Sequence, residues 1–234
     1  MGAMRYAITG ASRGLGLEFV RQLLVRGDTI EAGVRAPAEA RQLQGLAVES
    51  GGRLRIHALD VSAAHSVEAF AAAVSEGPPL DVLINNAGIK GAHQPLSGLD
   101  YEDMARTFTT NTVGTLRLTT ALLPALRRGS SRRIVHISTA LGSVGANDLG
   151  GMYGYRISKV ALNMAMRNMH LELRDEGFVT IALSPGWVKT DMGGPEAPLR
   201  PDESVRGMLH NVIDRLSAEH GGRFFGHDGA ELPW

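Results

Sequence analysis

Short apolar runs alternate with longer amphipathic patterns along the chain, and this alternation constrains the fold more than any other feature. Buried strands are expected at residues 5–9, 29–34, 54–58, 80–84, 133–138 and 180–183, with a weaker candidate at 223–225. Helices are expected at 15–25, 37–48, 61–74, 100–127, 152–176 and 201–218. Alternation of this kind predicts a parallel sheet with helices on both faces.

Length and composition narrow the class of protein. A chain of 234 residues suits one α/β domain, residues 1–234, better than two small ones. The formal net charge is zero, so nothing indicates a nucleic-acid partner. Cysteine is absent, and the eight histidines show no close ligand pairing, so we expect no metal site. With no signal peptide and no apolar run of roughly 18 residues, we expect no membrane span and a cytoplasmic location.

Glycines follow the first expected strand in the segment TGASRGLG, residues 9–16. Gly10, Gly14 and Gly16 would let the backbone turn tightly and approach a pyrophosphate at the start of the next helix. Ser12 and Leu15 lie in the same turn and are expected to contact the nucleotide. The spacing departs from G-x-G-x-x-G, and a turn that serves packing alone is the alternative. The strand before it and the helix after it favour nucleotide binding.

Two arginines bear on the choice of cofactor. The second strand ends with Val34 and is followed by Arg35, where an NAD enzyme usually carries an acidic residue. Arg13, in the glycine loop, could converge on the same 2′-phosphate. We therefore expect NADP(H). The alternative is that both arginines are ordinary solvated residues and that the cofactor is NAD(H).

The next two expected strands are followed by further polar loops. Asp60 and Val61 come after the third strand, where Asp60 could accept a hydrogen bond from adenine or merely cap the next helix, for which Ser62 is the expected cap. Asn86, Ala87 and Gly88 follow the fourth strand and could hold the adenosine, although Asn and Gly are also common in plain turns.

The segment MYGYRISK, residues 152–159, contains a candidate catalytic pair. Tyr155 and Lys159 are four residues apart and would share one face of a helix. An ammonium group beside a phenol is expected to lower the phenol's pKa, which would make Tyr155 a better proton donor and acceptor at neutral pH. An ordinary surface contact between the two side chains is the alternative.

These motifs together resemble the short-chain dehydrogenase/reductase family. In order, they read TGASRGLG, DV, NNAG, a helical Asn111, ISTALG, YRISK and PGWV. Within the family, the segments GGMYGYRISKVALN and SPGWVKTDMGGPEAPL and the ending DGAELPW resemble sniffer-type carbonyl reductases and C-factor-like bacterial proteins. The resemblance implies a single-domain, Rossmann-like, doubly wound parallel sheet of about seven strands.

The resemblance also implies roles for residues in the later motifs. Thr139 stands where the family usually has its catalytic serine, with Ser138 as the second choice, and Asn111 would hold a water beside Lys159. Tyr155 would be the proton donor, and Lys159 would also bind the nicotinamide ribose. The residues expected near the nicotinamide are Pro185, Gly186, Val188 and Thr190, at the start of a substrate loop around 186–200.

The expected function is NADP(H)-dependent reduction of a ketone, aldehyde or quinone to an alcohol. The alternative is a C-factor-like signalling or regulatory protein that binds the nucleotide with little turnover. The helix expected at 152–176 is apolar on more than one narrow face, and family members form dimers and tetramers, so we also expect a homodimer or homotetramer.

Overall fold

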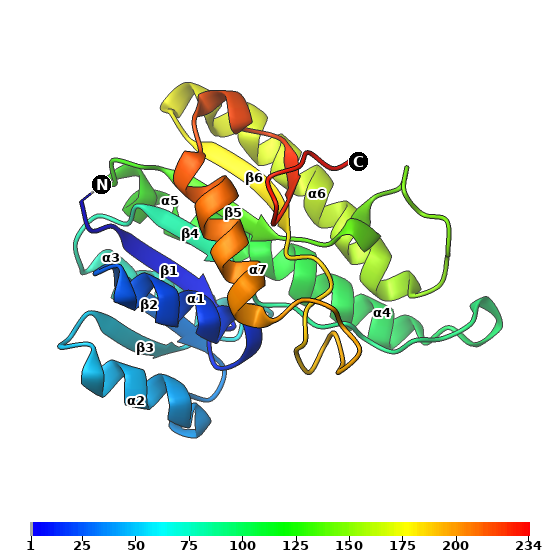
Figure 1. Cartoon of the computed structure of the whole chain (residues 1–234), viewed down its shortest axis with the longest axis horizontal. Helices are drawn as coiled ribbons and strands as arrows, with labels where there is room; N and C mark the ends of the chain where they lie inside the picture. The colour runs from blue at the N-terminus through cyan, green and yellow to red at the C-terminus, as the bar shows by residue number, and fades with distance from the viewer. Residues whose placement is uncertain (1) are drawn as a thin grey trace.

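Seven parallel strands form one sheet in the order β3-β2-β1-β4-β5-β6-β7 (Figure 1). The computed structural model describes residues 2–234. The strands are β1 (Arg5–Thr9), β2 (Thr29–Val34), β3 (Leu54–Ala58), β4 (Val82–Asn85), β5 (Arg133–Ile137), β6 (Val179–Ser184) and β7 (Phe224–Gly226). The order reverses between β1 and β4, which is where ligands bind in sheets of this kind.

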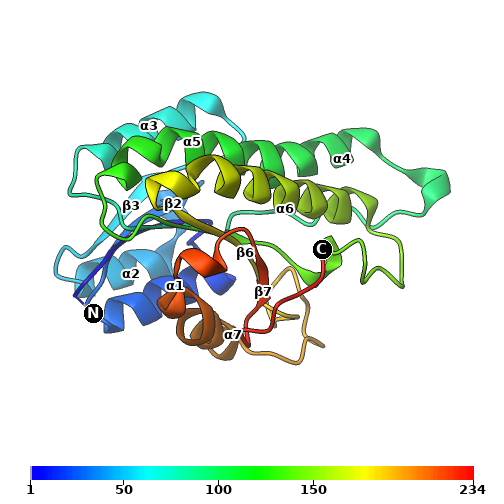
Figure 2. The same cartoon turned by 90° about the horizontal axis from the view of Figure 1, so that it is seen from above.

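Helices cover both faces of the sheet. They are α1 (Gly14–Val25), α2 (Arg41–Glu49), α3 (Ala64–Ser75), α4 (Tyr101–Phe108), α5 (Gly114–Arg127), α6 (Tyr153–Leu173) and α7 (Pro201–Gly207). Figure 2 shows α1, α2 and α7 on one side of the sheet and α3, α4, α5 and α6 on the other. The predicted doubly wound, Rossmann-like fold is therefore confirmed.

Two apolar cores hold these layers together, one on each face of the sheet. Ile8 of β1 packs in the core with Phe19 of α1, whereas Ala7, the neighbouring residue, packs in the core with Leu118 of α5. Successive side chains of a strand point to opposite faces, so a strand buried on both sides carries apolar residues without alternation. This explains why the central strands read as continuous apolar runs in the sequence.

The expected helix at 100–127 is interrupted. A π-helical turn, Thr109–Val113, separates α4 from α5. Within this turn, the side chain of Asn111 forms hydrogen bonds with Ile89 and Ser158. A second π-helical turn, Met208–Val212, follows α7, so the helix expected at 201–218 is also shorter than predicted.

The expected cap of α3 is wrong. Ala63 stands at the N-cap, and the Ser62 hydroxyl donates to Asp60 Oδ1 at 2.6 Å instead of accepting from the helix. Asp60 Oδ1 also accepts from Ser62 N at 2.9 Å, so this carboxylate closes a turn before the helix begins.

Candidate active site

A groove of about 1240 Å³ lies beyond the carboxyl ends of the strands. The predicted residues that line it are Gly10, Ser12, Arg13, Gly14, Leu15, Arg35, Asp60, Val61, Asn86, Ala87, Gly88, Ser138, Tyr155, Lys159, Pro185 and Thr190. Segments from both halves of the chain therefore meet in one place. The other predicted residues adjoin this lining: Gly16 packs on Gly10, Asn111 bonds to Ile89, Thr139 influences the pKa of Tyr155, and Gly186 and Val188 lie in the loop after β6.

In the glycine loop, the backbone conformation or close packing disfavours a side chain at Gly10, Gly14 and Gly16. Gly10 has φ +65°, and a Cβ there would lie 3.0 Å from Ala87 Cα. Gly14 has φ +54° and faces Thr190. A Cβ on Gly16 would collide with the Gly10 carbonyl oxygen, so this glycine allows α1 to approach the loop closely. The cradle at the start of α1 therefore fits a pyrophosphate group.

The segment after β4 is fixed to the glycine loop. The Thr9 hydroxyl accepts from the backbone N–H groups of Asn86, at 3.0 Å, and Ala87, at 2.8 Å. Asn86 Nδ2 donates to the Thr9 carbonyl oxygen at 2.8 Å. The Asn86 amide thus braces two strand ends, and the backbone around it forms the floor of the groove.

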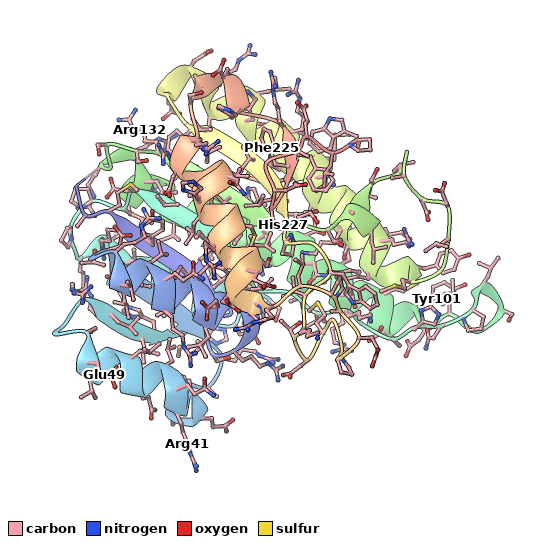
Figure 3. All side chains as sticks on the ribbon, viewed as in Figure 1. Arg41, Glu49, Tyr101, Arg132, Phe225 and His227 are labelled. Carbon is pink, nitrogen blue, oxygen red and sulfur yellow. The ribbon has the colours of Figure 1, made fainter. Side chains whose placement is uncertain are left out.

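Several arginines line the groove near the glycine loop and the segment after β2. Arg35 is exposed after β2, and Arg13 is exposed in the glycine loop, where its Nη1 lies 2.8 Å from Asp191 Oδ2. Arg21 of α1 and Arg41 of α2 also line this groove. Figure 3 shows Arg41 at the start of α2. Sequence reasoning missed these two because it considered only the loops, whereas both reach the groove from helices.

Tyr155 and Lys159 lie one helical turn apart on α6, as predicted. Lys159 is buried, and its Nζ donates to the Ile137 carbonyl oxygen at 2.7 Å. The same Nζ lies 5.9 Å from the centre of the Tyr155 ring. The Tyr155 hydroxyl faces Met192, at 3.9 Å from its sulfur. The pair therefore presents a phenol to the groove with an amine behind it.

The pKa values of this pair differ from the sequence expectation. Burial raises the pKa of Tyr155 to about 12, and a hydrogen bond with Thr139 offsets only part of that rise. Burial lowers the pKa of Lys159 to about 8. The expected lowering of the phenol's pKa by the ammonium is therefore wrong for this structure, because burial dominates the shift and Lys159 is not among its causes. At neutral pH the phenol keeps its proton, and the amine is mostly charged.

Two hydroxyls follow β5 and point in different directions. Ser138 is buried, and its Oγ donates to Asn163 Oδ1 of α6 at 2.7 Å. Thr139 is half-buried beside Tyr155 and accepts from Leu141 N at 3.2 Å. The alternation of side chains along an extended strand produces this difference.

Asn111 is held inside the π-helical turn. Its Oδ1 accepts from Ile89 N at 2.8 Å, and its Nδ2 donates to the Ile89 carbonyl oxygen at 2.8 Å and to Ser158 Oγ at 3.0 Å. Ser158 immediately precedes Lys159, so Asn111 joins the loop after β4 to the turn of α6 that carries the lysine.

A closed loop after β6, residues 186–200, covers one side of the groove and is here called the lid. Its two arms are joined by the bond from Lys189 N to the Leu199 carbonyl oxygen, at 2.8 Å. Trp187 Nε1 donates to the Gly193 carbonyl oxygen at 2.8 Å, and the residue is 57% exposed. Trp187 thus helps to fix the shape of the lid and still offers apolar surface.

Other kinds of site are not found in the described part of the chain. Across residues 2–234, no three histidine, aspartate or glutamate side chains come together as metal ligands would. In the same range, no helix combines the length and apolar character that crossing a membrane requires.

The fold and the groove define a doubly wound α/β protein with a tyrosine–lysine pair in a groove beyond the strand ends. The profile of the short chain dehydrogenase family matches residues 5–199, and the chain belongs to this family of oxidoreductases. The predicted family membership is confirmed.

Named relatives agree with this assignment. The chain is 58% identical to the C-signal of Myxococcus xanthus over 168 residues, which cover 72% of this chain and 100% of that protein. It is 36% identical to a 1-hydroxy-2-glutathionyl-2-methyl-3-butene dehydrogenase of Rhodococcus sp. over 232 residues, which cover 97% of this chain and 98% of that one.

Solved structures agree as well. The carbonyl reductase Sniffer of D. melanogaster has a TM-score of 0.94 at 32% identity, and an NADPH-bound carbonyl reductase from chicken fatty liver has 0.94 at 37% identity. Both alignments cover 100% of each chain.

Proposed function

We propose that this oxidoreductase reduces a small ketone, aldehyde or quinone to an alcohol with NADPH. The observation that carries the proposal is the position of the Tyr155 hydroxyl in the groove, with Thr139 beside it and the buried Lys159 behind it. The NADPH in the carbonyl reductase from chicken fatty liver supports the choice of cofactor.

The residues around the groove fit a dinucleotide phosphate. Gly10 and Gly14 would leave room for the pyrophosphate at the start of α1. Arg13 and Arg35 would attract the 2′-phosphate, because a guanidinium group matches phosphate oxygens in geometry and charge. Asp60 and Val61 would lie beside the adenine, and Thr190 beside the nicotinamide end.

Side chains of the protein would supply the proton that the reduction requires. Bound NADPH would supply the hydride. Tyr155 Oη would donate its proton to the substrate oxygen, and its high pKa means that the phenol is protonated at neutral pH. The Thr139 hydroxyl would donate a hydrogen bond to the same oxygen. The Lys159 ammonium would stabilise the phenolate that Tyr155 leaves behind, and Asn111 would hold the turn of α6 that carries Lys159.

A signalling or regulatory role with little turnover is the second candidate. The similarity to the C-signal of Myxococcus xanthus favours it. The presence of Asn111, Thr139, Tyr155 and Lys159 favours the enzyme, because a protein that only binds the nucleotide does not need all four.

A panel of small ketones, aldehydes and quinones, assayed with NADPH by the loss of its absorbance, tests the proposed function. We expect turnover of at least one class. Full binding of NADPH with no turnover of any carbonyl would favour the second candidate.

The expected assembly and location remain predictions. Exposed apolar side chains on α6, among them Ile157, Met164 and Leu171, are compatible with a homodimer or homotetramer. A mass equal to one chain in sedimentation would contradict that prediction. A cytoplasmic location is likewise a prediction.

A further inference from the structure

Asp191 and Met192 are consecutive residues at the tip of the lid, and each contacts a group assigned above to ligand binding. Asp191 Oδ2 lies 2.8 Å from Arg13 Nη1 in the glycine loop. Met192 faces the Tyr155 hydroxyl on α6. The lid tip therefore bridges the groove from its phosphate-binding side to its catalytic side.

The turn that carries these two residues is well braced. Thr190 Oγ1 accepts from Gly193 N at 3.1 Å, and the Thr190 carbonyl oxygen accepts from Gly194 N at 2.8 Å. Thr190 also packs against Gly14, where a Cβ would lie 3.4 Å from its Cγ2. The backbone thus fixes the position from which Asp191 reaches Arg13.

Arg13 has a long side chain that is 72% exposed, and Asp191 is its one ion-pair partner among residues 2–234. A guanidinium group binds carboxylate and phosphate oxygens through the same N–H donors. The donor that contacts Asp191 is therefore not available to a phosphate at the same time.

We propose that Asp191 is a positioning residue for cofactor selectivity, because its carboxylate competes with the 2′-phosphate of NADPH for Arg13. This inference rests on the proposed preference for NADPH. NADH carries no 2′-phosphate, so it has nothing to gain when Arg13 is released. The competition lowers the affinity for NADPH specifically and leaves that for NADH unchanged.

Titration of NADPH and NADH by protein fluorescence tests the proposal without any turnover. The variants are Asp191→Asn, Arg13→Gln and the double variant. Glu196→Gln is the matched control, because Glu196 is an exposed carboxylate on the same lid that forms no ion pair within residues 2–234. An exposed ion pair is weak, so we expect Asp191→Asn to lower the Kd for NADPH by about two- to fivefold. The Kd for NADH should not change, and Glu196→Gln should change neither.

The Arg13→Gln variant shows whether the effect of Asp191→Asn on NADPH binding depends on Arg13. There, Asp191→Asn should have no further effect on NADPH binding, since the contested guanidinium is gone. Equal changes for both cofactors, weaker NADPH binding by Asp191→Asn, or an effect that persists in Arg13→Gln would each overturn the inference. The wild-type protein tests the underlying function separately: NADH binding as tightly as NADPH would contradict the proposed cofactor preference.

Discussion

Lys159 Nζ lies 5.9 Å from the centre of the Tyr155 ring, one turn away on the same helix, and donates to the Ile137 carbonyl oxygen. The amine is thus anchored to the end of β5 and held behind the phenol. Burial raises the pKa of Tyr155 to about 12 and lowers that of Lys159 to about 8. The two groups therefore start in the states that a proton donor and its electrostatic support require at neutral pH.

Reduction should weaken in alkaline solution because Lys159 loses its charge. Its pKa of about 8 means that the ammonium is present below pH 8 and is lost as the pH rises through that value. Tyr155, with a pKa of about 12, keeps its proton throughout this range. We expect kcat/KM for carbonyl reduction, measured from pH 6 to 10, to fall with an apparent pKa near 8. A flat profile up to pH 10 would show that Lys159 is not the group that matters.

Thr139 and Ser138 should respond differently to removal of their hydroxyls. Thr139→Ala should lower kcat by about 100-fold or more, as the loss of a donor to a reacting oxygen does, whereas Thr139→Ser should retain most activity. Ser138→Ala should leave kcat nearly unchanged and reduce the free energy of unfolding by about 1 kcal/mol, because the side-chain oxygen of Asn163 loses the donor it has in Ser138. Steady-state kinetics and denaturant unfolding measure the two effects. The opposite pattern would assign the catalytic hydroxyl to Ser138.

Glu31 should make the free energy of unfolding depend on pH in the acid range. Burial alone would raise its pKa, but hydrogen bonds from His57, Arg5 and Arg55 hold the pKa at about 2. Because the folded protein lowers the pKa of Glu31 from its ordinary value of 4.5, the ionised carboxylate adds to the free energy of unfolding above pH 4.5. This contribution is lost as the pH falls towards 2. We expect a loss of about 2 to 3 kcal/mol over that interval.

Glu31→Gln should remove that acid sensitivity and destabilise the protein at pH 7 by about 3 kcal/mol, since Arg5 would remain buried without its anion. Urea unfolding at pH 7 and at pH 2.5 measures both effects. Glu49→Gln, an exposed change on α2, is the control and should alter neither. Equal unfolding free energies for Glu31→Gln and wild type at pH 7 would contradict this account.

Much of the fold was predictable because most of its strands are buried on both faces. Their apolar runs have no competing helical period, and most predicted strand ends lie within one or two residues of those found. The π-helical turn at Thr109–Val113 was not predictable, because it depends on bonds from Asn111 to Ile89 and Ser158 that only the folded chain brings together.

The candidate site was predictable to a similar degree and for a similar reason. Loops after parallel strands converge at one edge, so reading those loops located most of the groove. The direction of the Tyr155 pKa shift was not predictable, because burial is a tertiary property. The Arg13–Asp191 pair joins residues 178 apart in sequence, and no local sequence pattern predicts it.

The role of Tyr155 as the proton donor is tested most directly by a single-turnover experiment. Protein saturated with NADPH is mixed with a small dicarbonyl, and the loss of cofactor absorbance is followed for wild type, Tyr155→Phe and the control Tyr153→Phe. We predict that Tyr155→Phe lowers the rate by about 100-fold or more with an unchanged Kd for NADPH, and that Tyr153→Phe reacts like wild type. An undiminished rate in Tyr155→Phe would contradict the assignment of Tyr155 as the acid.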